Sequence, residues 1–373
     1  MADANELLTA NCQLPTANCQ LLTANCQLLT MPLAFTICSI NYLAQARTLG
    51  DSLRETNPDW TYVIGLVDDL ASANLPDELM PPYSMIEVAT IGIPDFAAMC
   101  ARYDITELNT AVKPFFIDYF YTAHPEFEKV VYFDPDIIVF QPLTRLENHL
   151  DEYSMVLTPH TCSPTPDWER PNEQHHLGTG IFNLGFIGLR ANEEARRFVN
   201  WWKERLVYEC RIDLCAGLFV DQHWVNFAPT YFDRVWIEKH SGYNAAYWNL
   251  HERLFSLDGN TWMVNGEEPL QFFHYSGYSP YKPDEVSKYQ TRYTFAEVQQ
   301  DGRASTRPTD RTDVEPLFAL YKERLLMNQN ERYRKYPCVY IKPPTILRYK
   351  RVRKLLNKPI HKLIDLLEER SLL

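Results

Sequence analysis

VVYFDPDIIVF, residues 130–140, sets two carboxylates one residue apart inside an otherwise unbroken apolar run. The β-branched and aromatic residues on both sides are typical of a buried strand. Asp134 and Asp136 are therefore charges where apolar side chains are the rule, and a buried charge needs a cation or a hydrogen-bonding partner. Pro135 cannot donate a hydrogen bond to a neighbouring strand, so we expect the strand to be interrupted here and to resume as IIVF.

The sequence before this stretch alternates between strand and helix patterns. Residues 32–40 and 60–68 have the pattern of buried strands, and residues 42–57 have that of an amphipathic helix. Residues 105–124 are mostly helical, with a break at Pro114, and lead into the quoted strand. This order predicts an α/β fold with a mainly parallel sheet covered by helices. Ligands of such sheets bind beyond the carboxyl ends of strands, which is where the two aspartates fall.

The spacing of the two aspartates has a chemical use. Residues i and i+2 of an extended segment project to the same side, so Asp134 and Asp136 can address one metal ion. Hard oxygen ligands favour Mg²⁺ or Mn²⁺, and such ions commonly hold a diphosphate beside the protein carboxylates. The alternative is a solvated turn between two strands, because a lone Asp-x-Asp occurs by chance in many proteins.

Composition excludes some functions. The chain has 373 residues, 46% of them hydrophobic, and can bury a substantial core. Its net charge of −12 argues against nucleic-acid binding, which depends on neutralising phosphates. Six cysteines beyond residue 30 contain no CxxC pair, which favours reduced thiols in the cytoplasm. No apolar run is long enough to span a membrane, and no basic region followed by an apolar segment marks a signal peptide.

The two ends of the chain differ from residues 31–330, which we expect to form the catalytic domain. TANCQL recurs at Thr9, Thr16 and Thr23, so residues 1–30 are interpreted as a low-complexity repeat, disordered or preceding a natural start at Met31. Residues 331–373 form a basic extension with leucines near helical spacing. This extension either packs as a helix on the catalytic domain or contacts an anionic membrane surface at the inner face.

Motifs along the chain add to the aspartate pair. They are SINY (39–42), the apolar-DPD-apolar element, GTGIFNLGFIGLR (178–190), FVDQHWVNFAP (219–229), SGYNAAYWNLHER (241–253) and QFFHYSGYSPYKP (271–283). Together and in this order they resemble the GT-A glycosyltransferases, especially the family 8-like sugar-nucleotide transferases. The match runs from about residue 35 to residue 283. It implies a GT-A type, Rossmann-like, mixed sheet and a metal-dependent transfer of sugar from a nucleotide-diphosphate donor, UDP-sugar above all.

The resemblance also implies roles for single residues. Asp134 and Asp136 correspond to the manganese-binding carboxylates, and His274 to the third metal ligand. The residues implied to bind the nucleotide-sugar are Asn41, Tyr42, Lys113, Gly277 and Lys282. Those implied to act at the donor sugar are Asn183, Asp221 and Gln222. The acceptor would be a saccharide or a lipid-linked saccharide, and the family retains the anomeric configuration.

The sequence departs from the family at two of these places. Ser39 stands where an acidic residue is frequent two positions before the Asn-Tyr pair, and Pro280 stands where a lysine usually follows the glycine of HYSG, with Lys282 two residues later. Ser39 concerns the contact with the nucleotide base, and Pro280 concerns the contact with the diphosphate. They do not touch the proposed metal ligands.

Structural alternatives exist for several of these side chains. His274 also fits an aromatic cluster, Asn183 a hydrogen bond to neighbouring backbone, and Asp221 an N-cap of the helix that begins near Gln222. Trp248 and Tyr247 are interpreted as packing groups.

Two functional alternatives also remain open. One is a haloacid-dehalogenase-like phosphotransferase, which uses an apolar strand followed by Asp-x-Asp but generally carries it on its first strand. The other is a noncatalytic protein that binds a sugar nucleotide.

Overall fold

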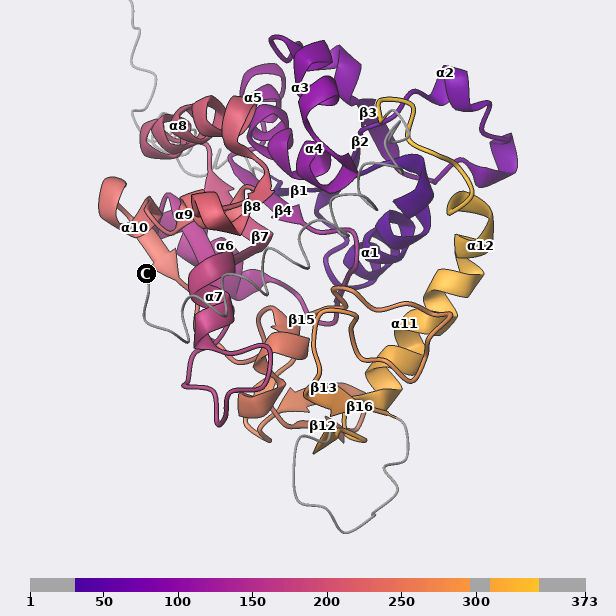
Figure 1. Cartoon of the computed structure of the whole chain (residues 1–373), viewed down its shortest axis with the longest axis vertical. Helices are drawn as coiled ribbons and strands as arrows, with labels where there is room; N and C mark the ends of the chain where they lie inside the picture. The colour runs from indigo at the N-terminus through magenta and orange to yellow at the C-terminus, as the bar shows by residue number, and fades with distance from the viewer. Residues whose placement is uncertain (1–30, 296–308, 342–373) are drawn as a thin grey trace, which may run out of the picture.

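The computed structural model describes residues 31–295 and 309–341. Its centre is a seven-stranded sheet of order β10-β6-β7-β4-β1-β2-β3 (Figure 1). Within this sheet β7 runs antiparallel to its neighbours β4 and β6, and the other strands are parallel. The predicted α/β class with a mainly parallel sheet is confirmed. The strands are β1 (Leu33–Cys38), β2 (Thr61–Leu66), β3 (Ser84–Glu87), β4 (Lys129–Phe133), β6 (Met155–Pro159), β7 (Phe182–Arg190) and β10 (Val235–Ile237).

Helices cover both faces of this sheet because alternate side chains of each strand point to opposite sides. On β1, Phe35 packs on Phe120 with ring centroids 5.1 Å apart, whereas Ala34 lies in the apolar cluster on the other face with Leu49. The first face is covered by α4 (Ile105–Ala111), α5 (Lys113–Ala123), α8 (Glu193–Glu209) and α9 (Gln222–Val225). The second face is covered by α1 (Leu43–Thr56) and α6 (Thr144–Glu152).

The predicted helix over residues 105–124 is two helices. Asp104 caps α4 in a capping box with Glu107, and α5 begins at Lys113 with Pro114 in its first turn. Proline has no N–H to donate to the preceding turn but fits a first turn, so the chain restarts its helix there.

A second sheet begins where the first strand of the opening stretch ends. The chain leaves β4 at Asp134 and continues as strand β5 (Ile137–Val139). This strand belongs to a second, three-stranded sheet of order β11-β15-β5. Its partners are β15 (Phe272–His274), antiparallel to β5, and β11 (Ala245–Ala246). The predicted interruption at Pro135 is therefore the passage from one sheet to another.

The remaining elements are short or peripheral. The helices are η1 (Ile40–Tyr42), α2 (Leu70–Ala73), η2 (Asp77–Leu79), η3 (Val88–Thr90), α3 (Phe96–Arg102), α7 (Glu173–Thr179), η4 (Leu214–Ala216), α10 (Ala228–Tyr231), η5 (Tyr247–Glu252), α11 (Glu315–Met327) and α12 (Asn330–Tyr333). The strands are β8 (Ile212–Asp213), β9 (Leu218–Phe219), β12 (Phe255–Asp258), β13 (Thr261–Val264), β14 (Glu268–Pro269), β16 (Tyr293–Thr294) and β17 (Thr309–Asp310). No helix in residues 31–295 and 309–341 is long and apolar enough to cross a membrane.

The beginning of the expected C-terminal extension packs on the body of the protein. The Tyr333 hydroxyl donates to the carbonyl of Leu79, and the ring of Tyr340 packs on Phe96 with centroids 5.1 Å apart. The rest of that extension, with its membrane interpretation, and the repeat of residues 1–30 lie outside the described residues.

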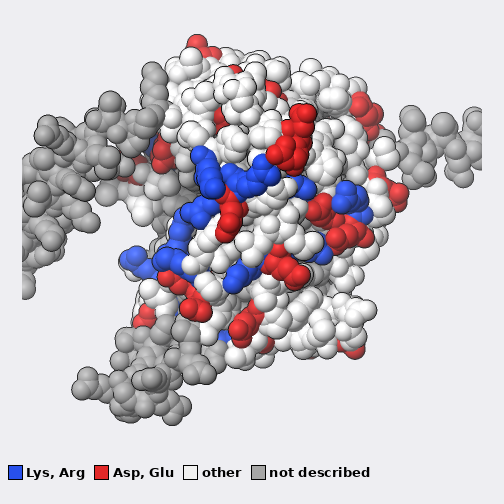
Figure 2. Space-filling view, turned by 90° about the vertical axis from the view of Figure 1, so that its right-hand side faces the viewer, with Lys and Arg blue, Asp and Glu red and all other residues white. Residues whose placement is uncertain are grey.

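The face toward α11 and α12 carries charges of both signs (Figure 2). Arg324 of α11 pairs with Glu55 of α1 at 2.8 Å, and Arg332 of α12 pairs with Glu78 at 2.8 Å. Exposed pairs of this kind contribute little to stability, because water and salt screen them. Basic side chains alternate with acidic ones on this face, so it offers no uniformly cationic surface for a polyanion.

Asp68 ties three segments together at the carboxyl edge of the main sheet. Its buried carboxylate accepts hydrogen bonds from the backbone N–H groups of Ile40 (3.2 Å), Asp69 (3.2 Å) and Val339 (2.9 Å). Burial raises the pKa of Asp68, and the three hydrogen bonds lower it but do not outweigh the effect of burial. The side chain thus fixes η1, the end of β2 and the C-terminal described segment against one another.

Replacing this carboxylate should destabilise the fold. Asp68→Ala leaves buried N–H donors without an acceptor, and we expect a loss of about 2–4 kcal/mol in the free energy of unfolding, measured by urea titration. Asp69→Ala, next in the chain but with an exposed carboxylate that caps α2, is the matched control and should lose much less. Equal losses in the two variants would contradict the role given to Asp68.

Candidate functional site

Asp134, Asp136 and His274 come together at the junction of the two sheets. His274 Nε2 lies 3.0 Å from Asp136 Oδ1 and 3.6 Å from Asp134 Oδ2. One ligand atom of each residue lies within 4.8 Å of the others. The two carboxylates are partly exposed while the imidazole is buried, so the cluster opens to solvent on its acidic side.

Backbone hydrogen bonds hold both aspartates in place. The Asp134 N–H donates to the carbonyl of Gly185 on β7 (2.7 Å), and the Tyr275 N–H donates to the carbonyl of Asp136 (2.8 Å). The Tyr132 hydroxyl also donates to Asp134 Oδ1 at 2.6 Å. Burial, and then the Asp134 carboxylate, raise the pKa of Tyr132 well above its usual range, so this hydroxyl remains a donor.

The His274 ring is fixed by close packing. The Trp248 ring meets it edge-on, with centroids 5.1 Å apart and planes at 89°. Burial alone would lower the pKa of His274, but Asp136 and Asp134 act against it and the net direction is upward. An anionic group of two carboxylates with one imidazole is a donor set that Mn²⁺ or Mg²⁺ accepts, so the residues present fit the expected ion. The interpretation of His274 as part of an aromatic cluster accounts for its contact with Trp248 but not for its contacts with the two carboxylates.

Lys113 and Asp221 form a buried ion pair beside this cluster. Lys113 Nζ lies 2.5 Å from Asp221 Oδ2, and the two side chains are 1% and 3% exposed. The same ammonium donates to the carbonyl of Leu184 (2.7 Å) and lies 4.2 Å from the Tyr132 ring centroid. Asp221 occupies the N-cap position of α9, as the alternative expected, but its side chain makes no capping hydrogen bond and accepts from Lys113 instead. Burial raises the pKa of Asp221, and the Lys113 charge counteracts that rise.

Asn183 and Gln222 belong to a buried network of amides. Gln222 Oε1 accepts from the N–H of Leu184 (3.1 Å) and from Asn183 Nδ2 (3.3 Å). Asn183 Oδ1 accepts from the Gly185 N–H (3.1 Å) and from Asn244 Nδ2 (3.1 Å). The structural alternative for Asn183 predicted a hydrogen bond to neighbouring backbone, and the bond to the Gly185 N–H is such a bond. Asn183 also bonds to other side chains. These amides are held in fixed orientations before any ligand arrives.

The residues expected around the nucleotide are distributed unevenly. Tyr42 lies near the cluster: although it is 43% exposed, partial desolvation, and then the charge of Asp136, raise the pKa of its phenol to about 12. Asn41 Oδ1 is buried without a hydrogen-bond partner in the part of the chain that the structure describes. Gly277 has φ +74°, and a Cβ there would lie 2.6 Å from Ser287 Oγ, so glycine is required on both counts. Lys282, by contrast, pairs with exposed Glu285 at 2.8 Å.

Sequence reasoning missed several residues of this region. Asn244 and His160 bond to Asn183, and Asn244 has φ +50°, a conformation that Asn tolerates. The backbone of Lys288 lies beside Gly277, since its N–H donates to the Gly277 carbonyl at 3.2 Å, and its ammonium lies 4.8 Å from the centroid of the Tyr289 ring. Asn244 stands within the motif of residues 241–253, but nothing in the sequence indicates which side chain it bonds. His160 and Lys288 lie outside the quoted motifs.

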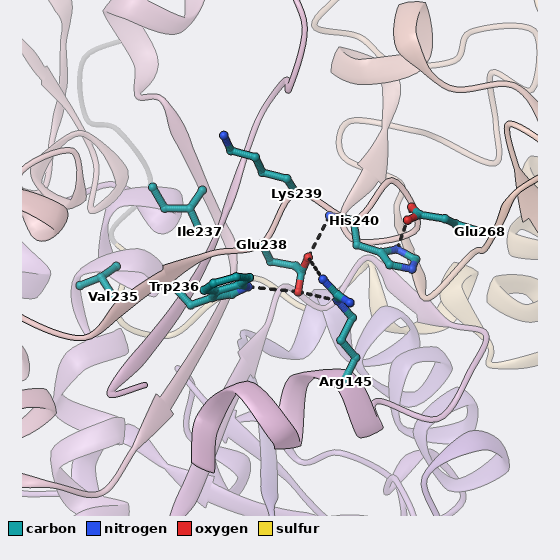
Figure 3. Close-up of a pocket in the computed structure, with 8 residues that line it drawn as sticks. All are labelled: Arg145, Val235, Trp236, Ile237, Glu238, Lys239, His240 and Glu268. Atoms are coloured by element: carbon teal, nitrogen blue, oxygen red, sulfur yellow. Dashed lines mark hydrogen bonds and ion pairs between the residues drawn. The ribbon is translucent and has the colours of Figure 1, made fainter. Parts of the chain in front are cut away.

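A separate surface hollow of about 540 Å³ lies along the edge strand β10 (Figure 3). Its buried Glu238 accepts from Arg145 Nε (2.9 Å), Trp236 Nε1 (3.4 Å) and the His240 N–H (2.9 Å). Glu268 in turn lies 3.3 Å from His240 Nδ1. Both carboxylates are thus engaged within the wall of the hollow. The acidic cluster at the sheet junction is the better candidate because its carboxylates face one another and solvent.

The comparisons with known proteins give distant similarities. No family model matches the chain. It is 25% identical to the uncharacterized protein YfnF of Bacillus subtilis (strain 168) over 291 residues, 78% of this chain and 90% of that protein. Among solved structures it is similar to the galactosyltransferase LgtC in complex with donor and acceptor sugar analogues, with a TM-score of 0.45, 16% identity, and coverage of 79% of this chain and 95% of that one. It is also similar to the glycosyltransferase GlyE of Streptococcus pneumoniae TIGR4, with a TM-score of 0.41, 16% identity, and coverage of 83% and 65%.

The acidic cluster should bind a divalent cation. We expect Mn²⁺ to bind the wild-type protein and its affinity to fall at least tenfold in Asp136→Asn, because one charged ligand is lost. Free Mn²⁺ is measured by electron paramagnetic resonance during titration. Asp258→Asn, which changes an exposed aspartate of β12, is the matched control. Equal affinity in Asp136→Asn and wild type would exclude the cluster as the binding site.

The buried pair gives a prediction with a pH signature. Lys113→Met leaves Asp221 buried without its cation, and we expect a loss of about 3–5 kcal/mol in the free energy of unfolding at neutral pH. The Asp221 pKa then rises further above that of the unfolded chain, so the folded form holds its proton more tightly. The loss should shrink as pH falls toward about 3.9, the value of an unperturbed aspartate. Urea unfolding at several pH values measures it.

The double variant Lys113→Met/Asp221→Asn is the control for this prediction. It removes both charges and should recover part of the stability at neutral pH and lose the pH dependence. A single variant as stable as wild type at pH 7, or a double variant that is no better than the single one, would contradict the pairing.

Proposed function

We propose that this protein is a glycosyltransferase of the GT-A type that moves a sugar from a nucleotide-diphosphate donor, UDP-sugar in particular, to a saccharide hydroxyl in a metal-dependent reaction. The observation that carries the proposal is the Asp134–Asp136–His274 cluster at the junction of the two sheets. It lies at the carboxyl end of β4, where open α/β sheets bind their ligands.

The cluster suits the charge that builds up during transfer. Cleaving the bond between sugar and diphosphate leaves negative charge on the nucleotide and positive charge on the sugar. Asp134, Asp136 and His274 would hold Mn²⁺ or Mg²⁺, which supplies electrostatic stabilisation of the diphosphate. Tyr42 and Asn41 are assigned to the nucleoside, and Gly277 to a close approach of backbone to the diphosphate.

The cations of the site have separate tasks in this proposal. Lys113 is assigned to the diphosphate or the donor sugar, and its ammonium is paired with Asp221 in the structure. Lys282 remains assigned to the diphosphate. To bind it, the ammonium of Lys282 would have to break its ion pair with Glu285. Lys288 is the alternative, because its backbone N–H bonds to Gly277.

The amide network is assigned to the donor sugar. Asn183, Gln222 and Asp221 stand beside the metal cluster in fixed orientations, which lowers the cost of ordering them around the transition state. We propose retention of the anomeric configuration, as in the family that the sequence resembles. The acceptor is a saccharide, with a lipid-linked saccharide at the inner face of the membrane as a narrower form of the proposal, and the enzyme is placed in the cytoplasm.

Nucleotide binding tests the proposal. In calorimetric titrations we expect UDP to bind the full chain in the presence of Mn²⁺ and to lose at least tenfold in affinity with EDTA or in Asp136→Asn, because the diphosphate then lacks its counter-charge. Asp258→Asn should bind like wild type. Incubation with UDP-sugars, Mn²⁺ and candidate saccharides should release UDP, and the anomeric proton of the product, seen by NMR, should keep the donor's configuration.

Each other outcome points to a different function. UDP binding without turnover for any donor would favour a noncatalytic sugar-nucleotide-binding protein. Binding that ignores both metal and Asp136 would remove the cluster from the mechanism. Failure to bind UDP, together with phosphate release from phosphate esters, would favour the phosphotransferase. An inverted product would overturn retention alone.

A further inference from the structure

Tyr132 and Asp134 stand two residues apart where β4 ends, so their side chains project to the same side of the chain. The Tyr132 hydroxyl donates to Asp134 Oδ1 at 2.6 Å. The other carboxylate oxygen, Oδ2, lies 3.6 Å from His274 Nε2. The two oxygens of Asp134 thus differ: one is directed to a hydroxyl of its own strand, and the other is directed to the cluster.

The main sheet holds the Tyr132 ring in place. Tyr132 is 3% exposed, and β4 pairs it with Phe35 of β1 on one side and with Ile187 of β7 on the other. The Phe35 ring meets it at 62° with centroids 5.2 Å apart. A ring that is packed between central strands has little freedom to turn. The position of the hydroxyl is therefore set by the sheet and not by the cluster.

A cation strengthens the bond from this hydroxyl. The Lys113 ammonium lies 4.2 Å from the centroid of the Tyr132 ring. A positive charge close to a phenol favours donation of its proton toward an anion, and hydrogen bonds to ionised acceptors are stronger than neutral ones. Turning Asp134 Oδ1 toward a bound ion would break this bond in a buried setting, which is costly.

Asp136 is not restrained in this way. Its Oδ1 lies 3.0 Å from His274 Nε2. Apart from this contact, its carboxylate has no hydrogen-bond or ion-pair partner in the part of the chain that the structure describes. The cluster therefore offers an ion one oxygen of Asp134, the carboxylate of Asp136 and the ring nitrogen of His274.

The number of available oxygens distinguishes between divalent cations. Mg²⁺ requires a small, nearly octahedral shell, to which a carboxylate usually gives one oxygen. Ca²⁺ is larger, takes more oxygen ligands and frequently binds both oxygens of a carboxylate. Imidazole is also a better ligand for Mn²⁺ than for Ca²⁺. A carboxylate that can present only one oxygen therefore disfavours Ca²⁺.

We propose that Tyr132 is a positioning residue that makes the cluster select Mn²⁺ or Mg²⁺ over Ca²⁺. By holding Asp134 Oδ1 it leaves Oδ2 for the ion and withholds the second oxygen that Ca²⁺ would use. Tyr132 acts through Asp134 and does not itself touch the ion. The inference rests on the proposed function for the presence of a metal site, and it names the residue that sets the selectivity of that site.

Ion selectivity of the full chain tests this role. Mn²⁺ affinity is measured from free Mn²⁺ by electron paramagnetic resonance, and Ca²⁺ affinity from the displacement of bound Mn²⁺. Tyr132→Phe keeps the ring and removes the hydroxyl, so we expect its Mn²⁺ affinity to fall about tenfold. Its Ca²⁺ affinity should stay the same or rise, because Asp134 can then present both oxygens. The ratio of the two affinities should therefore fall by at least a similar factor.

Tyr83→Phe is the matched control. The Tyr83 hydroxyl donates to Asp51 Oδ1 at 2.5 Å, outside the cluster, so its loss should leave both affinities unchanged. Equal losses of Mn²⁺ and Ca²⁺ affinity in Tyr132→Phe would reduce Tyr132 to a structural support, and unchanged affinities would show that its bond has no effect on the ion. Either result would overturn the proposal.

A second variant covers a failure to fold, which circular dichroism and urea unfolding would detect. Asp134→Glu keeps Tyr132 but carries the carboxylate past the hydroxyl on a longer side chain. The ratio of Mn²⁺ to Ca²⁺ affinity should be lower in this variant than in wild type. An unchanged ratio would contradict the role of Tyr132.

UDP titration separates this inference from the proposed transfer reaction. If the ratio falls in Tyr132→Phe while wild-type protein with Mn²⁺ fails to bind UDP, the selectivity role stands and the glycosyltransferase proposal falls. If wild type binds UDP with Mn²⁺ and the ratio does not change, the reverse holds. Wild-type protein that binds no Mn²⁺ would overturn both.

Discussion

The site depends on the passage of the chain from one sheet to another at Asp134–Pro135–Asp136. The backbone of Asp134 is fixed to β7 of the main sheet, and that of Asp136 is fixed to the residue after β15 of the second sheet. His274, the last residue of β15, is thereby brought to face both carboxylates. Two rigid sheets thus set the separation of the three groups, and proline suits the passage because it requires no ladder hydrogen bond from this position.

The charges behind this junction constrain the fold as well as the site. A lysine and an aspartate that are almost fully buried are expensive to desolvate, and the cost is offset only because each finds partners: Lys113 reaches Asp221, a carbonyl and the Tyr132 ring. Tyr132 in turn donates to Asp134. The pair is therefore joined by one side chain to the Asp134–Asp136–His274 cluster, so a change of charge at either place affects the other.

Local patterns predicted the frame of this protein and left its long-range partners unknown. The strand over residues 32–40, the helix over residues 42–57 and the break at Pro114 follow from periodicity and from the lack of an N–H in proline, which act within a few residues. The Asp-x-Asp spacing likewise signalled a same-side pair. Asp221 was different: the sequence left both a helix cap and a role at the donor sugar open, and only the fold reveals a lysine 108 positions away that donates to its carboxylate. The hydrogen-bond partners of Asn183 are set by packing in the same way.

Space as well as charge fixes the imidazole. A Cβ on Gly185 would lie 2.3 Å from His274 Cε1, 2.7 Å from Nδ1 and 2.9 Å from Asn183 Oδ1. The Trp248 ring, whose centroid lies 5.1 Å from that of His274, further limits the movement of the imidazole. Glycine on β7 therefore lets the buried histidine stand close enough to the carboxylates while Asn183 stays beside it. The same backbone position also accepts the Asp134 N–H, so one residue sets both the depth of the imidazole and the position of the first aspartate.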